Sequence, residues 1–202
     1  MALAAPVESK IVMGSNQEQL ARLFDGLGYQ KETHPVLKQA DALSSLESIV
    51  AYTLSELAEL KQEYEQYSAV QGKTDQQEKR LRHHFLMEFA DFMVMIKLAM
   101  EKLETPFSLE ENIFSINGQF KGQFDSLQEQ TLNIGEGNVM RNLHLIFSET
   151  LSLLKSLDIK LQAEVLCLSL NTKLWANREA RFFQKEANMN EADVLAKANH
   201  VF

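Results

Sequence analysis

Few residues in this sequence can interrupt a helix, and this scarcity is its strongest constraint on folding. The chain has 202 residues but only 8 glycines and 3 prolines, below average usage. Turns must therefore be few and the regular elements long. Because no run of alternating β-branched residues occurs either, the composition favours helices over strands. With 45% hydrophobic residues, the chain can form one domain with a substantial core.

Chain breakers and capping residues divide the first half of the sequence into two long helices. Pro35 opens a helical pattern of apolar residues that should end near Gly72. Thr74 followed by Gln77 is a capping-box signature, in which two side chains satisfy free backbone N–H groups at a helix start. A second helix should therefore run from this signature to about Leu103.

Weaker capping signals mark two further segments. Ser15 is a suitable N-cap for a short helix through Leu23. Ser108 and Glu111 repeat the capping-box spacing and predict a third segment in the middle of the chain. Glycines follow closely in that segment, which weakens its helical pattern.

The second half repeats the arrangement of two long helices. Residues 133–137 have the composition of a loop, and helical patterns follow over 138–157 and 159–187. We therefore predict an all-α fold, a single domain that forms a bundle of four to six helices. The domain spans residues 1–202. It contains a first helix pair at about 35–104, which carries the predicted metal site, and a second pair at about 138–187.

Charge and cysteine content exclude several classes of protein. The formal net charge of -8 is unlike the basic surface of a nucleic-acid-binding protein. Cys167, the one cysteine, sits in an apolar stretch and is read as a buried thiol, which fits a reducing cytosol. The start of the chain lacks the features of a signal peptide, and no apolar run approaches the length that crosses a bilayer. We expect a soluble, cytoplasmic protein without nucleic-acid or membrane partners.

Acidic residues lie within the apolar stripe of the first long helix. Residues seven apart on a helix nearly superimpose, so Glu56 is in line with Ile49 and Glu59 with Tyr52. Glu63 falls between these two lines. The stripe that is apolar at the start of this helix is therefore acidic toward its end.

The next helix has the same feature. Glu88 is in line with Leu81 and Met95, and Asp91 is in line with Leu98. An ordinary amphipathic helix would carry its acids opposite the apolar stripe. These carboxylates lie in the stripe or at its edge.

Carboxylates buried together are costly unless something compensates their charge. A divalent cation is the natural partner, and magnesium prefers hard oxygen ligands while keeping waters and substrate phosphates in its shell. Two carboxylates on each of two packed helices could supply such a shell. The alternative is a solvated acidic face, because Glu-rich helices are common.

The two acidic pairs also match the motif of a known family. Glu56-Leu-Ala-Glu59, twenty-eight residues, and then Glu88-Phe-Ala-Asp91 resemble the signature of the all-α NTP pyrophosphatase superfamily. That superfamily includes MazG proteins, phosphoribosyl-ATP pyrophosphohydrolases and dimeric dUTPases. The similarity covers roughly residues 43–103, just under a third of the chain, and implies a MazG-like bundle.

The resemblance implies cleavage between the α- and β-phosphates of a nucleoside triphosphate. The four motif acids would bind Mg²⁺, with Mn²⁺ as a substitute. Glu56, Glu59 or the adjacent Glu63 would orient or deprotonate the attacking water. Many members have a second glutamate where this chain has Ser55, so the identity of the general base stays open.

Polar residues on a C-terminal helix loosely resemble the segment that contacts phosphate and sugar in dimeric dUTPases. Lys173, Asn177, Arg178 and Arg181 suit phosphate oxygens, and Trp175 could stack on a base. The alternative is an exposed helix end with the indole in the core.

Three functions are consistent with these observations. The first is a pyrophosphohydrolase that removes canonical or damaged (d)NTPs, and the second is a dedicated dUTPase or pyrimidine dNTP pyrophosphatase. The third is a non-catalytic helical protein that binds nucleotides or a partner. The resemblance implies a homodimer or higher homo-oligomer.

Overall fold

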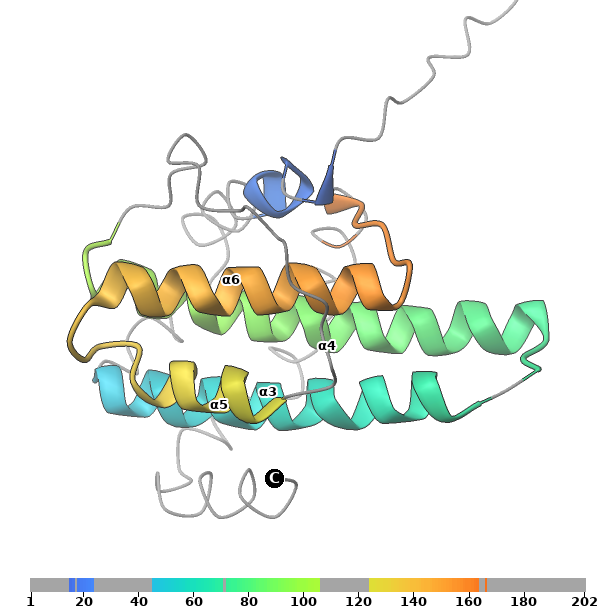
Figure 1. The fold of residues 1–202 in the computed structure, drawn as a ribbon, viewed down its shortest axis with the longest axis horizontal. Coiled ribbons are helices and arrows are strands. Elements are labelled where there is room, and N and C mark those ends of the chain that lie inside the picture. Colours follow the sequence, from blue (N-terminus) through green and yellow to red (C-terminus); the bar gives the residue numbers. More distant parts are fainter. Residues whose placement is uncertain are drawn as a thin grey trace, which may run out of the picture.

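The computed structural model describes residues 15–16, 18–23, 45–70, 72–105, 124–163 and 166, which are mostly helical and include no strand. The predicted all-α class is confirmed for these residues. The segment at Ser108, Cys167 and the polar residues 173–181 lie outside them. Figure 1 labels four helices: α3 (Leu46–Ala69), α4 (Asp75–Lys102), α5 (Phe124–Leu132) and α6 (Val139–Ser156).

Helices α3 and α4 form a long hairpin in which each start is fixed by a side-chain cap. The Thr74 hydroxyl accepts from the Gln77 N–H at 3.3 Å, and the Gln77 side chain accepts from the Thr74 N–H at 3.0 Å. The predicted capping box is confirmed. The expected start of the first helix at Pro35 is wrong, because Ser45 has extended backbone and caps α3 by accepting from the Ser48 N–H at 3.1 Å.

The tight turn between α5 and α6 is held by asparagine side chains. Asn138 caps α6 by accepting from the Arg141 N–H at 3.1 Å. The Asn142 amide donates to the carbonyls of Asn133 and Glu136 and so ties the loop to the first turn of α6. The predicted loop and the predicted helix after it are confirmed. Helix α5 contacts both α6 and α3, which places this second hairpin against the first.

The core lies between these helices and is dominated by α4. Phe85, Phe89 and Phe92 are completely buried at helical spacing, and rings of Phe85 and Phe89 lie 6.3 Å apart. Leu57 and Leu60 of α3 are also completely buried. None of the described helices is long and apolar enough to cross a membrane.

A short helical run near the N-terminus holds the chain that follows α6. The Asn16 amide donates to the Ile159 carbonyl at 2.9 Å, and its oxygen accepts from the Leu161 N–H at 2.9 Å. Gln19, only 4% exposed, accepts from the Ala163 N–H at 3.1 Å.

These three hydrogen bonds correct one prediction. A helix was expected to begin at Ile159, but residues 159–162 are not helical, because Asn16 occupies two backbone groups there. Gln19 holds the adjacent Ala163 N–H. The short N-terminal helix itself was expected, and its cap is confirmed. Ser15 and Glu18 bond each other's backbone N–H groups at 2.6 and 3.3 Å.

One buried hydroxyl in α5 lacks a partner, which leads to a stability prediction. Thr131 is completely buried and its Oγ1 makes no hydrogen bond to any described residue. A buried unsatisfied polar group costs on the order of 1 kcal/mol or more, so Thr131→Val should raise the melting temperature by roughly 2 to 4 °C. Thermal unfolding followed by circular dichroism measures this.

Thr150 provides a matched control. It is equally buried, but its hydroxyl donates to the Ile146 carbonyl. Thr150→Val should therefore give no stabilisation. Equal effects of the two substitutions would contradict the expectation.

Candidate metal centre

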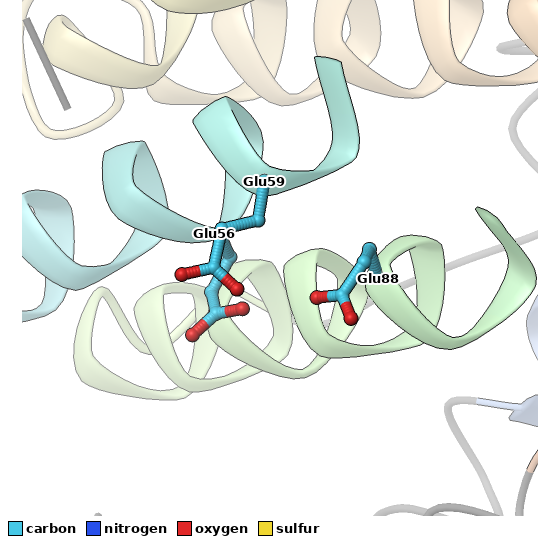
Figure 2. A group of neighbouring side chains, drawn as sticks. All are labelled: Glu56, Glu59 and Glu88. Atoms are coloured by element: carbon cyan, nitrogen blue, oxygen red, sulfur yellow. The ribbon is translucent and has the colours of Figure 1, made fainter. Parts of the chain in front are cut away.

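Three of the four predicted metal ligands meet between α3 and α4. Glu56, Glu59 and Glu88 each offer one carboxylate oxygen, and these oxygens all lie within 4.8 Å of one another. Figure 2 shows the pair from α3 and the single glutamate from α4 directed toward a common space. All three side chains are half-buried. Their partial burial supports the prediction that these acids lie in the apolar stripe or at its edge, and not on a solvated face.

The local sequence explains why these carboxylates converge. Glu56 and Glu59 are one turn apart on α3, so both project toward one side. Leu57 and Leu60, their neighbours in sequence, are buried in the core and hold α3 against α4. On α4, the buried Phe89 follows Glu88 directly and fixes the rotation of that helix. Only five residues separate the two helices, so the register between them is tightly constrained.

Asp91 lies near the three glutamates in sequence but is not one of the group. It is one turn beyond Glu88 on α4 and is half-buried. Asp91 thus shares α4 with Glu88, but the group whose carboxylate oxygens lie within 4.8 Å of one another contains only Glu56, Glu59 and Glu88.

Glu63 extends the acidic line by one further turn of α3. Its Oε1 accepts from the Gln66 side chain at 3.5 Å. Its Oε2 is buried and has no hydrogen bond to any described residue. A hydrogen bond from any donor that reaches this shielded carboxylate oxygen, such as a water, would stabilise it. Glu63, one turn beyond Glu59 on α3, can therefore accept a further hydrogen bond.

The donor set fits a hard divalent cation. Three carboxylates held within 4.8 Å of one another repel each other, and partial burial strengthens that repulsion. Magnesium or manganese accepts oxygen ligands of this kind and keeps further positions for water and phosphate oxygens. The cluster contains no histidine or cysteine, which makes it a poor zinc site. His83 and His84 are exposed on α4, with ring centroids 6.3 Å apart.

The predicted substrate-binding residues Lys173, Trp175, Asn177, Arg178 and Arg181 lie outside the described residues, so their contribution stays a prediction. Arg82 and Lys160, which no sequence motif indicates, line a cavity on another side of α4. Their sequence separation of 78 residues gave no local signal.

One acid outside the motif, Glu149 on α6, should contribute to the pH dependence of stability. Burial raises the pKa of the Glu149 carboxyl on α6 above its usual value. Its contribution to stability is therefore complete below the unfolded-state pKa and is lost as pH rises through the higher folded-state pKa. Glu149→Gln should raise the melting temperature at pH 7 by roughly 1 to 3 °C.

That difference should shrink toward zero at about pH 3.5, where the wild-type carboxyl is largely protonated in both states. Melting curves of both proteins at the two pH values test this. Glu129→Gln, at an exposed position of α5, is the control. A benefit of Glu149→Gln that is the same at both pH values would contradict the burial effect.

Comparison of the chain with protein-family models, with curated proteins and with solved structures gives no match. The function must therefore be inferred from the residues of the cluster and their geometry.

Proposed function

We propose that the protein is a magnesium-dependent nucleoside triphosphate pyrophosphohydrolase that converts a (d)NTP and water to a (d)NMP and pyrophosphate. The observation that supports this most strongly is the convergence of Glu56, Glu59 and Glu88 from two helices to within 4.8 Å. Their spacing is that of the motif that resembles the all-α NTP pyrophosphatases. Asp91 completes that motif one turn along α4.

The charge balance favours a substrate that arrives with a cation. A triphosphate is strongly anionic, and the chain carries a net charge of -8. Carboxylates alone would repel such a substrate. Glu56, Glu59 and Glu88, with Asp91, would hold Mg²⁺ against the phosphates. When bound, the metal neutralises charge on the phosphate oxygens and lowers the pKa of a coordinated water.

Other residues of the chain would then act on the attacking water. Glu63 has a buried carboxylate oxygen that accepts no hydrogen bond from the described residues, which suits a group that orients or deprotonates water. Ser55 occupies the position where many members of the superfamily have a second glutamate. This makes Glu63 the better candidate for the base. We also propose a homodimer, as the resemblance implies.

The direct test is an assay of the purified chain with a panel of (d)NTPs, in Mg²⁺ and in EDTA, with pyrophosphate and phosphate measured separately. Magnesium-dependent release of pyrophosphate is the expected result. Cleavage restricted to dUTP or other pyrimidine dNTPs would identify a dedicated enzyme. If no nucleotide is cleaved and Mg²⁺ does not raise the melting temperature, the proposal fails and a non-catalytic binding protein is favoured.

A further inference from the structure

A separate cavity lies between α4 and the chain that follows α6. Its volume is about 270 Å³, slightly below the range of roughly 300 to 1,000 Å³ typical of sites for drug-sized ligands. Any ligand must therefore be small. Its walls come from two segments that are distant in sequence: Arg82, His83, Leu86 and Met87 of α4, with Lys160, Gln162 and Leu166 beyond α6.

The ionisable residues around this cavity are all basic. Arg82, His83 and Lys160 line it, and no acidic residue is among its described lining residues. This is unusual in a chain with a net charge of -8. The Arg82 guanidinium donates to the Lys160 carbonyl at 3.5 Å. This hydrogen bond keeps the two cationic residues next to each other at the cavity. The other N–H groups of Arg82 can reach an anion.

Apart from the polar Gln162, the remaining lining is apolar. Leu86 and Met87 are half-buried side chains of α4, and Leu166 is only 4% exposed. A flexible methionine adapts well to the shape of a small ring or chain. A site with an apolar wall and a few convergent polar groups is the usual form of a small-molecule site. Lys160 and His83 are exposed, so the cavity can be entered from solvent.

We propose that this cavity binds a small amphipathic anion. A phosphate or carboxylate head would contact Arg82, His83 and Lys160. An apolar body no larger than one ring would lie against Leu86 and Met87.

This site is distinct from the glutamate cluster. On α4, residues 82, 83, 86 and 87 follow the spacing of one helical face, whereas Glu88 points between α3 and α4. Magnesium is not needed for an anion that contacts cationic side chains directly. The proposal therefore does not depend on the proposed enzymatic activity.

Phenyl phosphate is a suitable probe, titrated into the full chain in EDTA and followed by NMR amide shifts. Benzyl alcohol supplies the ring without the charge, and inorganic phosphate supplies the charge without the ring. We expect phenyl phosphate to bind at least roughly fivefold more tightly than either. Lys160→Gln should weaken its binding roughly threefold, while Glu59→Gln should leave it unchanged.

Lys102→Gln is the matched control, because it also replaces an exposed lysine and changes the net charge by the same amount as Lys160→Gln. It lies twenty residues beyond Arg82 on α4, about 30 Å along the helix axis. Equal weakening by the two lysine substitutions would indicate non-specific attraction and overturn the proposal. So would the absence of phenyl phosphate binding, or inorganic phosphate that binds as tightly as phenyl phosphate.

Discussion

Glu59→Gln will abolish most of the magnesium-dependent release of pyrophosphate, lowering kcat/KM by at least roughly a hundredfold. Glu59 shares the cluster with Glu56 from its own helix and Glu88 from the opposite one. Glutamine keeps the size of the side chain but removes the negative charge that holds a hard cation. The measurement is steady-state pyrophosphate release across a range of magnesium concentrations.

Glu65→Gln is the control for this substitution. Glu65 lies on α3 as well, but it is exposed and does not belong to the cluster. It should change kcat/KM by less than about twofold. Wild-type protein and Glu65→Gln should also show a higher melting temperature in Mg²⁺ than in EDTA, and Glu59→Gln should not. Equal activity in the two variants would refute the role of the cluster.

Asp91→Asn tests whether all four acids of the motif are needed for activity or only the three that meet between α3 and α4. Asp91 completes the sequence motif but is not among the three glutamates that meet within 4.8 Å. Loss of activity similar to that of Glu59→Gln would show that the fourth acid joins the site when metal and substrate bind. Retained activity would restrict the site to the three glutamates.

Features set by neighbours in sequence could be predicted well. The predicted capping box at Thr74 depends on hydrogen bonds between residues three apart, so the local pattern contains all the information needed. The convergence of Glu56, Glu59 and Glu88 could be predicted because helical periodicity places them on the faces that α3 and α4 share. Hydrophobic patterning and the Thr74 cap therefore indicated the two helices of the first hairpin and three of the acids that meet between them, but not the start of α3.

Features set by distant parts of the chain could not be predicted. The start of α3 is an exception, because its cap at Ser45 is local but the helical pattern that opens at Pro35 did not single it out. Residues 159–162 have the pattern of a helix start, yet Asn16 bonds the Ile159 carbonyl and the Leu161 N–H, and Gln19 bonds the adjacent Ala163 N–H. Tertiary hydrogen bonds of this kind override local propensity. The basic cavity has the same origin, since Lys160 reaches Arg82 only through that arrangement.

The double substitution Asn16→Ala with Gln19→Ala should lower the free energy of unfolding by about 3 kcal/mol, at about 1 kcal/mol for each of three lost hydrogen bonds. These bonds join residues 143 to 145 positions apart in the chain, so nothing local can replace them. The melting temperature should fall by roughly 6 to 12 °C. Urea unfolding gives the free energy, and Gln62→Ala, at an exposed position of α3, is the control.

The same variant separates the two proposed sites. The lost hydrogen bonds hold Ile159, Leu161 and Ala163, the stretch that carries Lys160 into the basic cavity. Phenyl phosphate binding should therefore weaken in the folded variant. The glutamate cluster is built on α3 and α4 alone, so the rise in melting temperature caused by Mg²⁺ should persist. If the rise in melting temperature caused by Mg²⁺ disappeared while phenyl phosphate still bound, the hydrogen bonds of Asn16 and Gln19 would support the metal centre instead. Their assignment to the cavity would then be wrong.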